Sequence, residues 1–98
     1  MYLQRLSAGK KRKNVTTDDL VELLEKQNYR CALSGEPLTC VLGKGMTHFT
    51  NASIDRIEPG SEYTKDNIRL VCRIANVMKW NMTDEELKQW CKRILDHA

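Results

Sequence analysis

The apolar and polar positions of this chain follow two different periods. In residues 54–57 and again in residues 67–72, apolar side chains have the close spacing of short β-strands, and Pro59-Gly60-Ser61 between them is typical of a turn. From about residue 73 to residue 80 the period becomes helical, with Ile74, Val77 and Met78 on one side. This order predicts a β-hairpin that runs directly into a helix.

Two further helices are predicted on either side of the hairpin. Thr16 precedes two aspartates and a stripe of leucines, which predicts a helix that begins at Thr16 and ends near residues 27–28. Thr83 and Glu86 have the spacing of a capping box, and apolar residues follow them at helical intervals up to Leu95. We expect this last helix to pack against the first predicted helix and the back of the hairpin.

Length and composition indicate one small globular domain of the α+β class. The 98 residues are 41% hydrophobic and 30% charged, with both signs mixed. No apolar run approaches the roughly 20 residues that cross a bilayer, and the start of the chain lacks the features of a secretory signal. We therefore expect a cytoplasmic protein without membrane contact, in which the four cysteines are free thiols.

The positive charge is concentrated at the start of the chain. The first 13 residues hold five basic residues and no acid, so the remaining 11 basic and 13 acidic residues sum to −2 within a net charge of +3. We expect residues 1–15 to form a basic arm and residues 16–98 a single domain. Such an arm is either a solvated terminus or a surface for a nucleic-acid backbone, formed by Lys10, Lys11, Arg12 and Lys13.

The hairpin and its helix carry the candidate chemistry. Asp55 offers a carboxylate and Asn76 an amide oxygen, and Mg²⁺ prefers such oxygen ligands. Lys79 follows Asn76 by three positions on the same helical face, where an ammonium could meet a phosphate. Asn67 is expected to brace the loop by bonding its backbone. Each residue alone could be an ordinary surface residue, but their joint placement favours a site.

The ordered set Asp55-Arg56-Ile57, Tyr63, Asn67, Asn76, Lys79 resembles the HNH endonuclease family, also called ββα-metal or His-Me finger, and in particular its small phage and bacterial members. The likeness extends over residues 28–95. It implies a ββα-metal core flanked by N- and C-terminal helices, and a phage- or mobile-element-encoded DNA endonuclease that uses Mg²⁺ or Mn²⁺ to hydrolyse phosphodiesters. Asp55 and Asn76 would hold the cation. Arg69 and Arg73 would extend the phosphate-binding surface, unless they belong to a solvated face.

One position departs from the family pattern. Most members have a histidine general base after the aspartate, whereas this chain has Arg56, which stays protonated and cannot take a proton from water. Arg56 could still bind the scissile phosphate or stabilise transition-state charge. His48, Glu58 or solvent would then activate the water, although His48 could also be an exposed loop residue. The alternative function is a catalytically impaired HNH-fold module that binds nucleic acid or a protein.

The cysteines do not repeat the zinc knuckle that many members of this family carry. Its two Cys-x-x-Cys pairs correspond here to Cys31-x-x-Ser34 and Cys72-x-x-Ala75, so half of the ligands are missing. Cys40 and Cys91 do not have knuckle spacing. We therefore expect small buried hydrophobic side chains rather than structural zinc.

Overall fold

The computed structural model describes residues 2–8, 14–42 and 48–97. Its centre is an antiparallel pair of strands, β1 (Ala52–Arg56) and β2 (Ile68–Cys72). The register places Asp55 directly opposite Arg69. A short 3₁₀ helix, Lys65–Asn67, leads into β2. The predicted hairpin is confirmed, with boundaries shifted by one or two residues.

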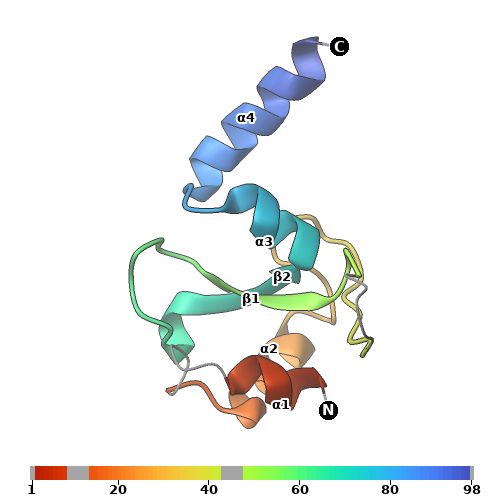
Figure 1. Ribbon diagram of the computed structural model, residues 1–98, viewed down its shortest axis with the longest axis vertical. Coiled ribbons are helices and arrows are strands. Elements are labelled where there is room, and N and C mark those ends of the chain that lie inside the picture. Colours follow the sequence, from red (N-terminus) through yellow and green to blue (C-terminus); the bar gives the residue numbers. More distant parts are fainter. Residues whose placement is uncertain (1, 9–13, 43–47, 98) are drawn as a thin grey trace.

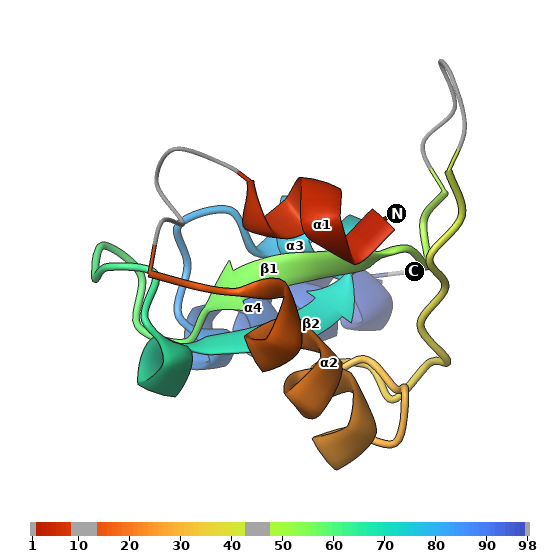
Figure 2. The same ribbon diagram turned by 90° about the horizontal axis from the view of Figure 1, so that it is seen from below.

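Four α-helices surround the strands: α1 (Tyr2–Ser7), α2 (Thr17–Lys26), α3 (Arg73–Lys79) and α4 (Asp84–His97). Helix α3 follows β2 without a loop and packs across both strands, while α1 and α2 lie on the opposite side of the sheet (Figures 1 and 2). The α+β class predicted from the sequence is confirmed. Within the described ranges, no helix is long and apolar enough to cross a membrane.

The two faces of the sheet have different partners because successive strand residues point to opposite sides. One face carries Ile54, Ile68 and Leu70, which are buried against Leu20 and Leu24 of α2. The other face carries Val71, which packs with Ile74 and Ala75 of α3, and also the charged pair of Asp55 and Arg69. The sheet therefore has an apolar core on one side and a mixed, partly charged layer on the other.

Helix α2 confirms its predicted capping. The Thr16 side chain accepts a hydrogen bond from the Asp19 amide at 3.1 Å, and the Asp19 carboxylate accepts one from the Thr16 amide at 3.0 Å. The helix ends with Gln27 as its C-cap. Gln27 also bonds the backbone of Leu70 in both directions, so the end of α2 is fixed to β2.

The basic arm expected over residues 1–15 contains helix α1, which the sequence pattern does not predict. Tyr2, Leu3 and Leu6 pack against the main core, and the Tyr2 hydroxyl donates to the backbone oxygen of Ala52. These apolar residues recur at helical spacing within only six residues, which is too short a window for a periodic signal. The beginning of the chain therefore contributes a helix to the core.

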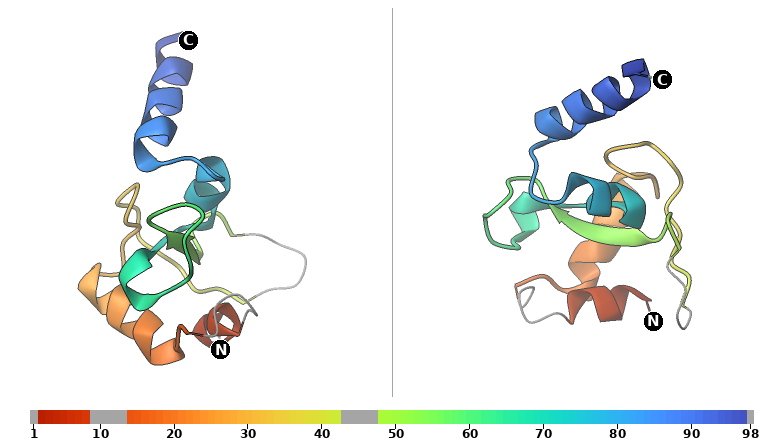
Figure 3. Two further views of the ribbon diagram at one scale, coloured as in Figure 1. Left: turned by 90° about the vertical axis from the view of Figure 1, so that its left-hand side faces the viewer. Right: turned by 45° about the horizontal axis from the view of Figure 1, so that its top comes forward.

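Helix α4 does not pack as expected. It extends away from the sheet and from α1 and α2, as Figures 1 and 3 show. Of its residues only Leu87 is buried, while Trp90, Ile94 and Leu95 are 52%, 69% and 75% exposed. The expectation that this helix covers α2 and the hairpin is wrong. Its direction is set at its first turn, where Asp84 is ion-paired with Arg69 of β2.

Candidate functional site at the hairpin and α3

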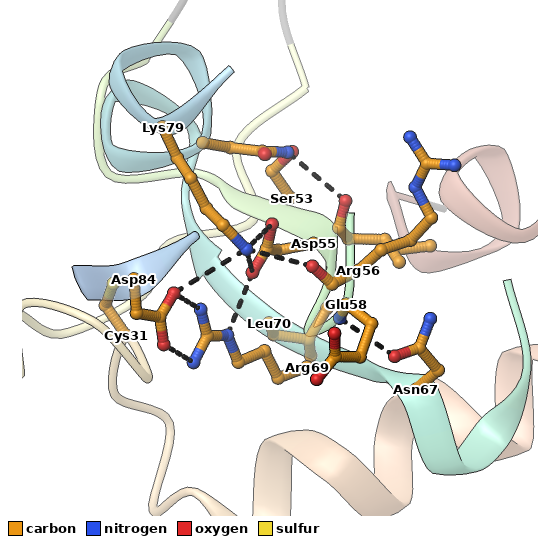
Figure 4. Close-up of polar contacts among 12 residues, drawn as sticks. Cys31, Ser53, Asp55, Arg56, Glu58, Asn67, Arg69, Leu70, Lys79 and Asp84 are labelled. Atoms are coloured by element: carbon orange, nitrogen blue, oxygen red, sulfur yellow. Dashed lines mark hydrogen bonds and ion pairs between the residues drawn. The ribbon is translucent and has the colours of Figure 1, made fainter. Parts of the chain in front are cut away.

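Asp55 lies at the centre of a compact network of charges. Its side chain is buried in β1, and its two carboxylate oxygens each lie 3.1 Å from the Nζ of Lys79. The Nε of Arg69 donates to the same carboxylate at 2.9 Å (Figure 4). The strand register places Asp55 and Arg69 opposite each other, and α3 supplies Lys79 from above the strand. The carboxylate is therefore neutralised by cations from two separate elements.

Lys79 differs from its predicted role. It is only 1% exposed, and its Nζ also donates to the backbone oxygen of Arg56 at 2.9 Å. An ammonium has three donors, and here two point to Asp55 and one to a carbonyl. In this arrangement Lys79 does not make the expected contact with a phosphate, because its ammonium group binds Asp55 and the backbone inside the protein.

Arg69 extends the network to α4. Its terminal nitrogens form a bidentate pair with Asp84 at 2.9 and 2.6 Å, and Lys79 lies 3.6 Å from the same carboxylate. The hydrogen bonds from Arg69 lower the pKa of Asp84 and raise the pKa of Arg69. Two acids and two bases alternate, so the cluster is neutral. Arg69, predicted as part of a phosphate-binding surface, is instead engaged internally.

Asn76 is fixed to the first strand. Its Nδ2 donates to the hydroxyl of Ser53 at 2.7 Å and to the backbone oxygen of Ile54 at 3.2 Å. The amide nitrogen is therefore occupied by the protein, which leaves the amide oxygen as the atom able to face a ligand. Ser53, which begins the Ser-x-Asp-Arg-Ile stretch, is not among the predicted site residues, and its contact with Asn76 depends on the packing of α3 against β1.

An open pocket of about 260 Å³ lies along this junction. Its lining includes Asp55 and Asn76, the two predicted metal ligands, together with Arg56 and Arg73. Arg73 is exposed, and no ion pair of its side chain occurs among the described residues. Trp80 also lines this pocket and is 78% exposed. Because Lys79 and Arg69 neutralise Asp55, the arginines give the pocket a positive balance.

The loop between the strands is braced as predicted. The Oδ1 of Asn67 accepts from the Glu58 amide at 3.0 Å, and its Nδ2 donates to the Glu62 carbonyl at 3.0 Å. Arg56 also binds this loop, with Nη1 donating to the Ser61 carbonyl at 3.0 Å and the guanidinium 4.9 Å from the centre of the Tyr63 ring. In this arrangement Arg56 supports the loop beside the pocket.

The predicted general base is not brought to the pocket. His48 lies four residues before β1, its carbonyl accepts from the Asn51 amide, and it is not among the lining residues. Glu58 is exposed and does not line the pocket either. The basic residues Lys10, Lys11, Arg12 and Lys13 lie outside the described residues.

The two cysteines that correspond to a zinc knuckle do lie together. The Sγ of Cys31 accepts hydrogen bonds from the amides of Cys72 at 3.2 Å and Ser34 at 3.3 Å. Burial acts to raise the pKa of Cys31, but these and further hydrogen bonds outweigh it and lower the pKa, whereas burial raises the pKa of Cys72. Cys40 and Cys91 are exposed, and all four thiols are free.

The donors at the pocket fit a hard divalent cation in their chemical type. Asp55 and Asn76 provide one carboxylate and one amide oxygen, and Mg²⁺ sites commonly combine one or two carboxylates with waters and substrate phosphate. The competing group is the Lys79 ammonium, which contacts both Asp55 oxygens. No cluster of three or more His, Cys, Asp or Glu side chains suited to a metal occurs in the part of the chain that the structure describes.

Fold and pocket together define a small α+β domain with a charged pocket where a hairpin meets a helix. Comparisons of the chain with protein-family models, with curated proteins and with solved structures find no match. The function is therefore argued from the residues and geometry of this chain.

Proposed function

We propose that this chain is a metal-dependent DNA endonuclease of the HNH type. The observation that carries the proposal is the position of Asp55 and Asn76, which lie 21 residues apart in the sequence and line one open pocket together with two arginines. A carboxylate and an amide oxygen can hold a divalent cation, and guanidinium groups can bind phosphate, so this set suits a metal-assisted attack on a phosphodiester.

Asp55 and Asn76 would hold the divalent cation, which would act as a Lewis acid on the scissile phosphate. Arg73 is exposed at the pocket and would bind a neighbouring phosphate, and Trp80 offers an aromatic surface for a base. The bond from Asn76 to Ser53 keeps the amide oriented. Lys79 and Arg69 position Asp55, while water enters from the open side of the pocket without a fixed histidine beside it.

A second candidate, a nucleic-acid-binding module with impaired catalysis, is favoured by one specific observation. Asp55 is already neutralised by Lys79 and Arg69, so a cation at this carboxylate must displace or accommodate the Lys79 ammonium. A pocket whose carboxylate is neutralised and whose Arg73 is exposed attracts an anion more readily than a cation. This module would bind the DNA backbone without cutting it.

Plasmid cleavage separates the two candidates. Supercoiled DNA is incubated with the full chain in Mg²⁺, Mn²⁺ or EDTA, and the wild type is compared with Asp55→Asn and Asn76→Ala. Asn81→Ala, an exposed asparagine just beyond α3, is the matched control. Circular dichroism confirms that each variant is folded. The endonuclease proposal expects nicking that requires the metal, is lost in both pocket variants and persists in Asn81→Ala.

Binding to the same DNA in EDTA is measured over a range of salt concentrations. Affinity that falls steeply with salt, without cleavage in any metal, would overturn the endonuclease and leave the binding module. If the protein neither cuts nor binds DNA, both candidates fail. Metal-dependent nicking that survives in folded Asp55→Asn and Asn76→Ala would place the active site elsewhere.

A further inference from the structure

An apolar stripe on α4 lies outside the proposed site and is mostly exposed. Its members recur at helical spacing and are Leu87, Trp90, Cys91, Ile94 and Leu95. Of these only Leu87 is buried, and the helix extends from the body in all the views of Figures 1 and 3. An apolar helix face of this length normally packs against another element. Within the described chain, most of this one does not.

A groove between α3 and α4 enlarges this apolar surface. It has a volume of about 370 Å³ and lies beside Leu87 and Cys91, which belong to the stripe. Ala75, Met78 and Cys72 line it from α3 and the end of β2. A single 14-residue helix offers a small interface, because stable complexes bury about 800 Å² on each partner. The groove gives the stripe a concave extension that can receive a bulky side chain.

The charges along α4 point to a partner with the same sequence in the reverse direction. The first turn is acidic, with Asp84, Glu85 and Glu86, and the basic residues Lys88, Lys92 and Arg93 follow, before Asp96, which is paired with Lys92. Glu86 and Arg93 border the same edge of the stripe, two turns apart. Antiparallel helices would place each Glu86 near the partner's Arg93, whereas parallel helices would put the two copies of this edge on opposite sides of the interface.

We propose that two copies of this chain associate through antiparallel packing of their α4 helices, with the apolar stripe of each copy covering that of the other. The Arg93 guanidinium lies 4.8 Å from the centre of the Trp90 ring and restricts this side chain to the edge of the stripe, where the partner helix would contact it. The dimer leaves the pocket at Asp55 open, because that pocket is lined by β1, the loop that follows β1, α3 and Trp80.

Sedimentation equilibrium of the full chain tests the association. The proposal expects a monomer–dimer equilibrium, and Ile94→Glu should raise the dimer dissociation constant by about tenfold or more because it buries a charge in the interface. Gln89→Glu introduces the same side chain on the opposite face of α4 and should leave the constant unchanged. A monomer at all concentrations up to about 1 mM would overturn the proposal. An unchanged dissociation constant in Ile94→Glu would show that α4 does not form the dimer interface.

The direction of pairing has its own test. In the antiparallel dimer Arg93→Glu opposes Glu86 of the partner and weakens association, and adding Glu86→Lys restores it. In a parallel dimer the edges that carry Glu86 and Arg93 in the two copies lie on opposite sides of the interface, so neither change would have this effect. Because Glu86 also caps α4 through Thr83, circular dichroism checks the helix content of the double variant. A dimer that ignores Arg93→Glu contradicts the antiparallel arrangement.

Discussion

The junction between the hairpin and α3 contrasts with the body of α4. At the junction Asp55, Lys79, Arg69 and Asp84 are all partnered, and the strongest contacts join elements far apart in the sequence. Along α4 the side chains beyond the first turn reach mainly into solvent. Both segments begin from clear local signals. The difference between these two segments shows that local helical signals do not bring a helix into the core. The helix joins the core only where its side chains contact other elements and so fix its direction.

The largest expected effect comes from removing the buried cation of the junction. Lys79→Met should lower the free energy of unfolding by about 3–5 kcal/mol, because Asp55 loses a buried ion-pair partner that Arg69 alone does not replace. Urea denaturation monitored by circular dichroism measures the change. Lys88→Met, the same substitution at an exposed position of α4, should change stability by less than about 0.5 kcal/mol. Equal effects at the two positions would contradict the internal role of Lys79.

Apart from α1, the α-helices and strands of this fold could be predicted because their signals are local. The Thr16 and Thr83 caps, the turn at Pro59-Gly60-Ser61 and the change of period near residue 73 all act within a few residues. The brace made by Asn67 could be anticipated for the same reason, since it closes over a short loop.

What could not be predicted depends on tertiary geometry. A lysine three positions after Asn76 has the same pattern whether it faces solvent or Asp55, and only the packing of α3 across β1 decides between them. The direction of α4 likewise depends on a turn in which Trp80 adopts a positive φ of 49°, and on the pairing of Asp84 with a residue of β2. Helical spacing in the sequence indicates which face of a helix is apolar, but it does not indicate which element covers that face.

Two substitutions within α4 compare its buried beginning with its exposed end. Leu87→Ala should destabilise the monomer by about 2 kcal/mol, because this side chain is 8% exposed at the junction with α3. Ile94→Ala removes a similar side chain that is largely exposed, and should cost less than about 0.5 kcal/mol. Urea denaturation at protein concentrations below the dimer dissociation constant compares them. Similar losses in both variants would mean that the end of α4 is packed in the monomer.

The smallest expected effect concerns the ion pair between Arg69 and Asp84, which joins the hairpin to α4. The bonds from Arg69 lower the pKa of Asp84, so the folded state holds this carboxylate deprotonated more firmly than the unfolded state does. The stabilisation is present above the unfolded pKa near 4 and is lost as the pH falls through the lower folded pKa. Asp84→Asn should cost about 1–2 kcal/mol at neutral pH, and this difference from the wild type should shrink below about pH 4.

Urea unfolding of the wild type and Asp84→Asn measures this dependence between about pH 2.5 and about pH 7, a range that begins more than one unit below an ordinary aspartate pKa and extends to neutral pH. Asp96→Asn is the matched control, because among the described residues Asp96 forms its ion pair with the exposed Lys92 on the far part of α4. A cost of Asp84→Asn that does not change with pH would show that the ion pair with Arg69 contributes little. In that case the burial of Leu87 would hold the first turn of α4 in place of the ion pair. The direction of the helix could then change when a partner covers the stripe.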